Sequence, residues 1–186
     1  MARELVGATL VVDAGTPFEV RARIVETEAY LGSTDAASHA FAGPTPRAQV
    51  MFGPPGHLYV YLSYGMHHCA NLVCAPDGEA AAVLLRAAEV VGGEAHVRAR
   101  RGTAVAIERL LSGPGNLCRG LAIAIADNAD DVCGNGRLHV EAAAAPQSVR
   151  SGPRVGISRA TDLPLRFWDA SSAAVSGPRR RATTGS

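Results

Sequence analysis

Alternating apolar and polar residues in the first 75 positions are typical of β-strands. Ala8–Ala14 and Phe18–Tyr30 flank a Gly-Thr-Pro turn, so we expect two strands joined at that turn. Leu58–Tyr64 and Met66–Ala75 lie on either side of Tyr64-Gly65, which indicates a β-hairpin with these two residues at its tip. The pattern therefore predicts at least two strand pairs before the middle of the chain.

The second half mixes strands with short helices. Ala80–Val90 is apolar except for Arg86 and Glu89, which favours a buried strand, although its alanines also permit a helix. Further helices are expected at Glu94–Arg101, Ala104–Leu111 and Pro114–Ala126, and further strands at Leu138–Ala142 and Arg154–Ser158. Because strands and helices mix without regular βαβ units, we expect an α+β fold. It would be a single mixed domain with a mostly antiparallel curved sheet, flanking helices and a protruding β-hairpin.

Segments rich in Gly, Pro and polar residues separate these elements. Residues 31–56 form a long irregular segment, which inside a compact domain is usually functional or disordered. Residues 127–136 read as a loop, and residues 1–7 as the last turn of a helix that ends near Gly7. Residues 177–186 are basic and lack apolar side chains, so we expect a disordered tail after one domain spanning residues 1–176.

Within the second strand, the character of one predicted face changes along its length. Side chains two apart share a strand face, which here would carry Val20, Ala22, Ile24, Glu26, Glu28 and Tyr30. That face begins apolar and ends with two carboxylates and an aromatic ring. A carboxylate beside an aromatic wall is suited to activating water against a flat ring substrate.

The composition limits which catalytic mechanisms are available to the protein and where in the cell we expect it. The chain has 186 residues and a formal net charge of +1, and all 18 of its basic side chains are Arg. Arg gives bidentate phosphate contacts, although high-GC codon usage is the better explanation of the bias. Schiff-base chemistry through a side-chain amine is excluded, because there is no Lys. No signal or membrane-spanning segment is evident, so we expect a cytoplasmic monomer that does not bind membranes.

Histidines and cysteines allow a metal-site hypothesis, which we weigh as an alternative. His39, His57, His67, His68 and Cys69 cluster in sequence, but the neighbours His67 and His68 point to opposite strand faces. The four cysteines lack CxxC spacing and read as buried free thiols. We therefore expect no metal and no organic cofactor.

Several short motifs follow one another in a fixed order between about residues 3 and 168. They are Arg23-Ile24-Val25-Glu26-Thr27-Glu28-Ala29-Tyr30-Leu31-Gly32, Ala37-Ser38-His39, Thr45-Pro46-Arg47, Met51 to Tyr61, Tyr64-Gly65-Met66 with Asn71, Ala82 to Ala87, Gly113-Pro114 with Leu117-Cys118, Gly152 to Gly156, and Leu165-Arg166-Phe167-Trp168. Each motif alone is weak, but the ordered set resembles the alkyladenine (3-methyladenine) DNA glycosylase family.

The resemblance implies an enzyme of base excision repair that needs no metal or organic cofactor, and the absence of Lys predicts that it is monofunctional. It would flip damaged purines, chiefly alkylated ones, out of double-stranded DNA, with its hairpin in the minor groove. Hydrolysis of the N-glycosidic bond would then leave an abasic site. A non-enzymatic DNA-binding module that kept the fold remains an alternative.

The resemblance also assigns roles to individual residues. Glu28 matches the catalytic glutamate that activates water. Tyr30, His39 and Tyr61 match the rings that hold the flipped base, through cation–π and stacking forces on the order of 0.5–2 kcal/mol each. Tyr64 matches the residue that fills the gap in the stack. For a lone Tyr or His in a strand, simple packing is the ordinary interpretation.

Three further positions complete the predicted site. Asn71 matches the position that discourages normal guanine by crowding its exocyclic amine. Arg86, alone in an apolar run, is either a buried ion-pair partner or a positioner of the nucleophilic water. A buried guanidinium requires a carboxylate such as Glu28 nearby. Arg47 and Arg154 are candidate phosphate contacts.

The chain also departs from the family pattern at three places. Ala48 stands where Asn is common, Asn116 stands where a basic residue is frequent, and the chain starts inside the helix that usually precedes its first motif. A polar contact near Ala48 is therefore expected to be lost.

Overall fold

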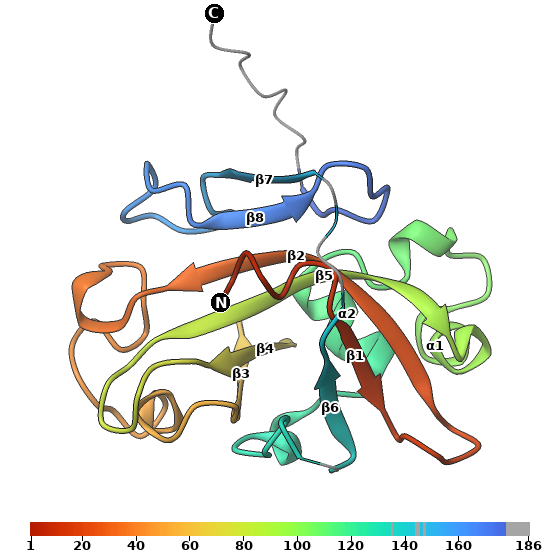
Figure 1. Ribbon diagram of the computed structural model, residues 1–186, viewed down its shortest axis with the longest axis horizontal. Coiled ribbons are helices and arrows are strands. Elements are labelled where there is room, and N and C mark those ends of the chain that lie inside the picture. Colours follow the sequence, from red (N-terminus) through yellow and green to blue (C-terminus); the bar gives the residue numbers. More distant parts are fainter. Residues whose placement is uncertain (135, 144–145, 147, 178–186) are drawn as a thin grey trace, which may run out of the picture.

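The long strand β2 (Val20–Tyr30) organises the sheet in this computed structural model, which describes residues 1–134, 136–143, 146 and 148–177. β5 (Ala82–Gly92) pairs with β2 in antiparallel fashion along nearly its whole length. The other edge of β2 is divided between β1 (Thr9–Val12) and β8 (Arg166–Asp169), as Figure 1 shows. β2 therefore borders three strands and connects the two ends of the molecule.

The described strands form one eight-stranded sheet, ordered β3-β4-β5-β2-β1-β6, with β8 pairing to β2 and to β7. The remaining strands are β3 (Leu58–Ser63), β4 (His67–Val73), β6 (Leu138–Glu141) and β7 (Val149–Gly152). Every pairing between these strands is antiparallel. Together with the two helices, this curled sheet confirms the α+β prediction (Figure 1).

A register shift in β2 corrects the single strand face predicted from the sequence. Ile24 pairs with Ala88 but Glu26 pairs with Ala87, the adjacent residue of β5, which points to the opposite face. Val25 is therefore the extra residue of a β-bulge. Val20, Ala22 and Ile24 face the main core, whereas Glu26, Glu28 and Tyr30 lie on the opposite side.

Two helices cover the core face of the sheet. α1 (Glu94–Arg101) has the predicted bounds, and α2 (Pro114–Leu121) begins at the predicted proline. α2 ends early because Ala122 is left-handed, at φ 54°. Leu117 and Leu121 of α2 pack with Ile24 and Leu85 in the main core. The helix side thus supports the sheet and leaves the other face free for chemistry.

Other expected elements differ from the structure. Only Ile107–Arg109 of the helix expected at Ala104–Leu111 forms, as a 3₁₀ turn. Just before it, Arg98 donates to the carbonyl oxygens of Thr103 and Val105. Residues 1–7 form turns, and residues 154–158 form a loop. The tail expected at 177–186 lies outside the described residues from 178 onward. Of the free cysteines, Cys69 and Cys118 are buried as expected, whereas Cys133 is exposed.

The segment expected to be functional lies over the second face of the sheet. Residues 31–56 contain two 3₁₀ turns, Gly32–Thr34 and Gln49–Phe52, and bury Met51 against Tyr59 of β3. The β3–β4 connection is a tight turn in which Met66 donates its N–H to Ser63 O at 3.1 Å. Among the described residues, no helix is long and apolar enough to span a membrane.

Candidate functional site

Strand pairing aligns a row of side chains across the second face of the sheet. Tyr59 of β3 pairs with Asn71 of β4, which pairs with Leu84 of β5. Leu84 pairs in turn with Glu28 of β2, and Glu28 with Arg166 of β8. Residues directly opposite in adjacent strands share a face. The fold therefore brings positions 28, 59 and 71 together although they are distant in sequence.

Above this row lies an open cleft of about 910 Å³. Seven of the nine site residues expected from the sequence line it, namely Tyr30, His39, Arg47, Tyr61, Tyr64, Asn71 and Arg86. Glu28 and Arg154 lie behind its wall instead, in contact with lining residues. The volume is ample for one purine ring system.

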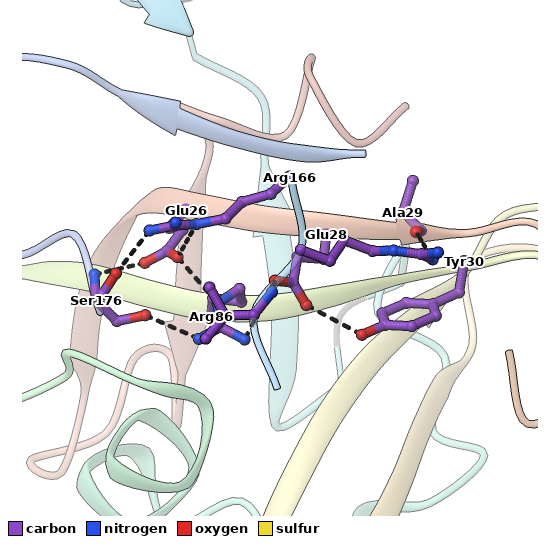
Figure 2. Close-up of polar contacts among 9 residues, drawn as sticks. Glu26, Glu28, Ala29, Tyr30, Arg86, Arg166 and Ser176 are labelled. Atoms are coloured by element: carbon purple, nitrogen blue, oxygen red, sulfur yellow. Dashed lines mark hydrogen bonds and ion pairs between the residues drawn. The ribbon is translucent and has the colours of Figure 1, made fainter. Parts of the chain in front are cut away.

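Glu28 is fully buried, and each of its carboxylate oxygens is held. Oε2 accepts the Tyr30 hydroxyl at 3.0 Å, and Oε1 accepts the Val155 N–H at 2.7 Å (Figure 2). Arg86 Nη1 lies 3.3 Å from Oε1. The three partners also line the cleft, so the carboxylate stands directly behind its wall. Val155 was not singled out from the sequence, because a backbone donor leaves no mark on residue type.

Arg86 joins Glu28 to a second buried acid. Its Nε donates to Glu26 Oε1 at 2.9 Å, and Arg166 Nε donates to the same oxygen at 2.7 Å. Burial alone would lower the pKa of Arg86, but the charges of Glu28 and Glu26 raise it above its ordinary value. The charges of two carboxylates and two guanidinium groups therefore balance in this cluster. The carboxylate expected beside Arg86 is present.

Aromatic rings form one wall of the cleft. The rings of His39 and Tyr61 meet edge to face with centroids 4.6 Å apart, and Tyr59 lies 5.5 Å from Tyr61. His39 Nδ1 is 3.0 Å from the Tyr59 hydroxyl. Burial and the nearby charge of Arg47 lower the pKa of His39, which favours a neutral ring at neutral pH. Tyr59 was not among the expected site residues, since nothing in its local sequence separates it from core.

Tyr30 forms part of the cleft wall beside Glu28. Burial, together with the charge of Glu28 and the hydrogen bond to it, raises the pKa of the Tyr30 hydroxyl. Tyr30 therefore stays protonated and donates to the carboxylate. The Arg154 guanidinium lies over the Tyr30 ring, 4.7 Å from the ring centroid.

The surroundings of Arg154 do not favour the phosphate contact expected from the sequence. Its side chain is fully buried and forms a bidentate pair with Asp35, with N–O distances of 2.5 and 2.8 Å. A phosphate contact requires an exposed guanidinium. Arg154 instead bonds to Asp35, near the start of the 31–56 segment, and packs on the Tyr30 ring, so that it holds the two in place.

Arg47 and Tyr64 are the exposed members of the set. The Arg47 guanidinium lies 4.8 Å from the Tyr61 ring centroid, and Tyr64 is 88% exposed at the turn between β3 and β4. Both are accessible to a large ligand approaching the cleft.

The departures at Ala48 and Asn116 have local structural consequences. Ala48 is fully buried against the Met51 and Tyr59 cluster, so an apolar contact replaces a polar side chain there. Asn116 donates to the carbonyl oxygen of Ser112 at 2.7 Å across the start of α2.

Within the described part of the chain, no three His, Cys, Asp or Glu side chains gather as a metal site.

Comparison with known proteins assigns the family. The model of the family described as Methylpurine-DNA glycosylase matches residues 1–173. A protein of Cutibacterium acnes named "Putative 3-methyladenine DNA glycosylase" is 54% identical over 164 residues, covering 84% of this chain and 85% of its own length. Proteins with the same name from Corynebacterium glutamicum and Methanocella arvoryzae are 48% and 47% identical, over 96% and 95% of this chain and 92% and 89% of theirs. The chain thus belongs to the methylpurine-DNA glycosylase family, whose enzymes are hydrolases that act on N-glycosyl bonds in DNA.

Proposed function

We propose that this enzyme is a monofunctional 3-methyladenine DNA glycosylase that flips alkylated purines out of double-stranded DNA and hydrolyses their N-glycosidic bond. The observation that carries the proposal is a buried Glu28 carboxylate directly behind an aromatic-walled cleft, 3.3 Å from Arg86. An acid held in a dry environment beside a fixed cation is suited to activating one water molecule.

In the proposed reaction, Glu28 takes a proton from a water molecule whose oxygen bonds to C1′ of the flipped nucleotide. The C1′–N bond breaks, and the purine leaves with its electron pair. Each oxygen of an ionised carboxylate has lone pairs beyond the one hydrogen bond from Tyr30 or Val155, so the acid still has room for a water. Arg86 orients that water, and the carboxylate stabilises the oxocarbenium-like sugar.

Selection of the damaged base rests on the cleft wall. N3- and N7-alkylated purines are cationic, and the rings of Tyr30, Tyr61 and His39 attract a cationic face more than a neutral one. Asn71 is 4% exposed and donates to Tyr59 O at 3.0 Å, which holds its amide fixed against the exocyclic amine of guanine. Neutral lesions such as hypoxanthine and ethenoadenine gain less from these rings.

DNA is expected to approach through the exposed end of the cleft. Tyr64 would enter the minor groove and fill the space left by the flipped nucleotide, while Arg47 contacts the backbone. The product would be an intact abasic strand for base excision repair.

Substitution of Glu28 by Gln tests the proposal. The amide keeps the size of the side chain but cannot take the proton. We expect single-turnover release of 3-methyladenine or 7-methylguanine to fall by about 10²–10⁴-fold. Binding to a duplex with an abasic-site analogue should persist, as the cleft and hairpin are unchanged.

Glu108→Gln is the matched control, because Glu108 is an exposed acid away from the cleft. It should release bases at the wild-type rate. Wild-type release by Glu28→Gln would refute Glu28 as the general base, and a wild-type enzyme that binds lesions without releasing them would favour the non-enzymatic alternative.

A further inference from the structure

After β8, the chain returns across the second face of the sheet as residues 170–176, which we call the C-terminal strap. Its first part is held by polar contacts, since Ser172 donates its hydroxyl to Glu89 at 2.5 Å. Asp169, just before the strap, pairs with Arg23 at 3.0 Å. Further along, Ala174 and Val175 are 1% and 6% exposed and pack with Val25 and Ala87. The stretches of β2 and β5 around the bulge therefore support the strap.

The last residue of the strap, Ser176, directs all its polar atoms at the buried charge cluster. Its N–H donates to Glu26 Oε2 at 2.6 Å, and its carbonyl oxygen accepts Arg166 Nη2 at 2.6 Å. Its hydroxyl oxygen accepts Arg86 Nη2 at 3.1 Å. Figure 2 shows these contacts converging on Ser176 from β2, β5 and β8. Ser176 is 5% exposed, so water does not compete freely for the same partners.

These contacts fix the plane of the Arg86 guanidinium. Two of its nitrogens are held, Nε by Glu26 and Nη2 by Ser176. A guanidinium is planar and rigid, so two fixed points determine where its third nitrogen lies. That nitrogen, Nη1, is the one 3.3 Å from Glu28 Oε1.

We propose that Ser176 is a positioning residue for base excision: its hydroxyl holds Arg86 so that Nη1 faces Glu28 and the water between them. The inference rests on the function proposed above. Ser176 does not line the cleft, and it acts only through Arg86. The last residue of the C-terminal strap thereby positions a side chain of the site, although the strap lies across the sheet from the hairpin that would meet DNA.

Charge alone does not account for the role of Ser176. Glu28 is faced by Tyr30 from its own strand, by Arg86 from β5 and by the Val155 N–H from the 154–158 loop. Arg154 is a further nearby cation, and Glu26 is neutralised by Arg86 and Arg166. Removing the Ser176 hydroxyl changes none of these charges. It frees Arg86 to pivot about its bond to Glu26 and move away from Glu28.

Ser176→Ala tests the inference in the full chain. We expect single-turnover release of 7-methylguanine to slow by about 10- to 100-fold, the range that misplacement of a catalytic group produces. The dissociation constant for an abasic-analogue duplex should change less than about twofold. A purely structural role would lower the melting temperature but leave the release rate of the folded protein unchanged.

Two further variants sharpen the test. Ser176→Thr keeps a hydroxyl and should recover most of the wild-type rate. Ser171→Ala removes an exposed hydroxyl that donates to Asp169, and should match the wild type in rate. If Ser176→Ala does not fold at the assay temperature, Ser176→Cys, which offers a weaker acceptor of similar size, is judged by the same criteria.

A wild-type release rate in a folded Ser176→Ala protein would overturn the inference while leaving the proposed function intact. Failure of the proposed function shows separately, as a wild-type enzyme that releases no alkylated base or as an active Glu28→Gln variant. The two ideas therefore fail in distinguishable ways.

Discussion

His39 is a residue whose charge depends on its immediate surroundings. Burial disfavours its protonated form, and the Arg47 charge disfavours it further, so the pKa of His39 lies below its ordinary value. The unfolded chain therefore binds this proton more readily than the folded enzyme. The resulting stability is fully present above the unfolded pKa of about 6.5 and is lost as the pH falls below it.

We expect that loss to disappear in a His39→Gln variant. The unfolding free energies of the wild type and the variant should differ by a smaller amount at pH 5 than at pH 8. Urea unfolding at both pH values measures the difference. An equal difference at the two pH values would contradict a lowered pKa for His39.

Asp35 and Arg154 are a second case in which partner and burial act together. Both side chains are fully buried, so an Asp35→Asn variant leaves an uncompensated guanidinium. Removing one partner of such a pair typically costs about 3–5 kcal/mol of stability. Because Arg154 also stacks on Tyr30, base release should fall as well.

Thermal and urea unfolding, together with single-turnover assays, measure both effects of Asp35→Asn. Asp162→Asn, at an exposed acid, is the control and should change neither. Burial raises the pKa of Asp35, but the Arg154 and backbone N–H donors outweigh it and lower the pKa overall. The stability from the pair is thus present above about pH 4 and is lost only as the pH falls through the lower folded pKa. A variant as stable as the wild type would show that the pair is energetically neutral.

At the scale of elements, the β2 bulge explains why sequence patterning located the acid but not its face. Alternation from Val20 to Tyr30 assigns one side to all six alternate residues, whereas the bulge at Val25 moves Glu26 and Glu28 to the other side. A bulge depends on pairing with β5, which a single strand's residues do not encode. The change from apolar side chains to carboxylates, between Ile24 and Glu26, coincides with the bulge at Val25.

Elements with strong local signals were predictable, and those formed by distant pairing were not. α1 has its expected bounds at Glu94–Arg101, since its helical residues are bounded by glycines. β7 and β8 were missed, because short polar strands such as Val149–Gly152 form only by pairing with each other and with β2. The resemblance to a known family likewise singled out side chains lining the cleft. Tyr59 packs there and Val155 contributes a backbone N–H, and residue type reveals neither contribution.

The β3–β4 turn places Tyr64 in a backbone conformation that does not favour a tyrosine. Tyr64 and Gly65 both have positive φ, at 50° and 69°, as expected in the type I′ turns that suit hairpins. A tyrosine in this conformation is strained and gains little from packing at 88% exposure. We expect a tyrosine at this position to serve DNA binding and not stability.

We therefore expect Tyr64→Asn to keep or raise the melting temperature while weakening lesion excision. Asn tolerates the left-handed conformation but cannot fill the gap in a base stack. Melting curves and single-turnover rates on a methylated duplex measure the two effects. Met66→Ala, at another exposed apolar residue of the turn region, gives a measure of nonspecific loss. Unchanged excision by Tyr64→Asn would contradict the intercalating role.

At the scale of the whole molecule, the absence of Lys limits the reaction pathway. All 18 basic side chains are Arg, which does not form Schiff bases with the sugar at ordinary pH. The remaining amine is the α-amino group of Met1, which pairs with Glu4 at 2.5 Å in an exposed position. The chain is therefore expected to release the base without cleaving the DNA backbone.

Borohydride trapping provides the decisive measurement. An enzyme that attacks the sugar through an amine is captured as a covalent protein–DNA adduct, whereas direct hydrolysis by water leaves nothing to reduce. We expect no adduct with a methylated duplex, and an abasic strand that breaks only after alkali treatment. A glycosylase with a nucleophilic lysine serves as the positive control. An adduct that persists would implicate the Met1 amine, and its loss after chemical blocking of that amine would replace water with the N-terminus as the nucleophile.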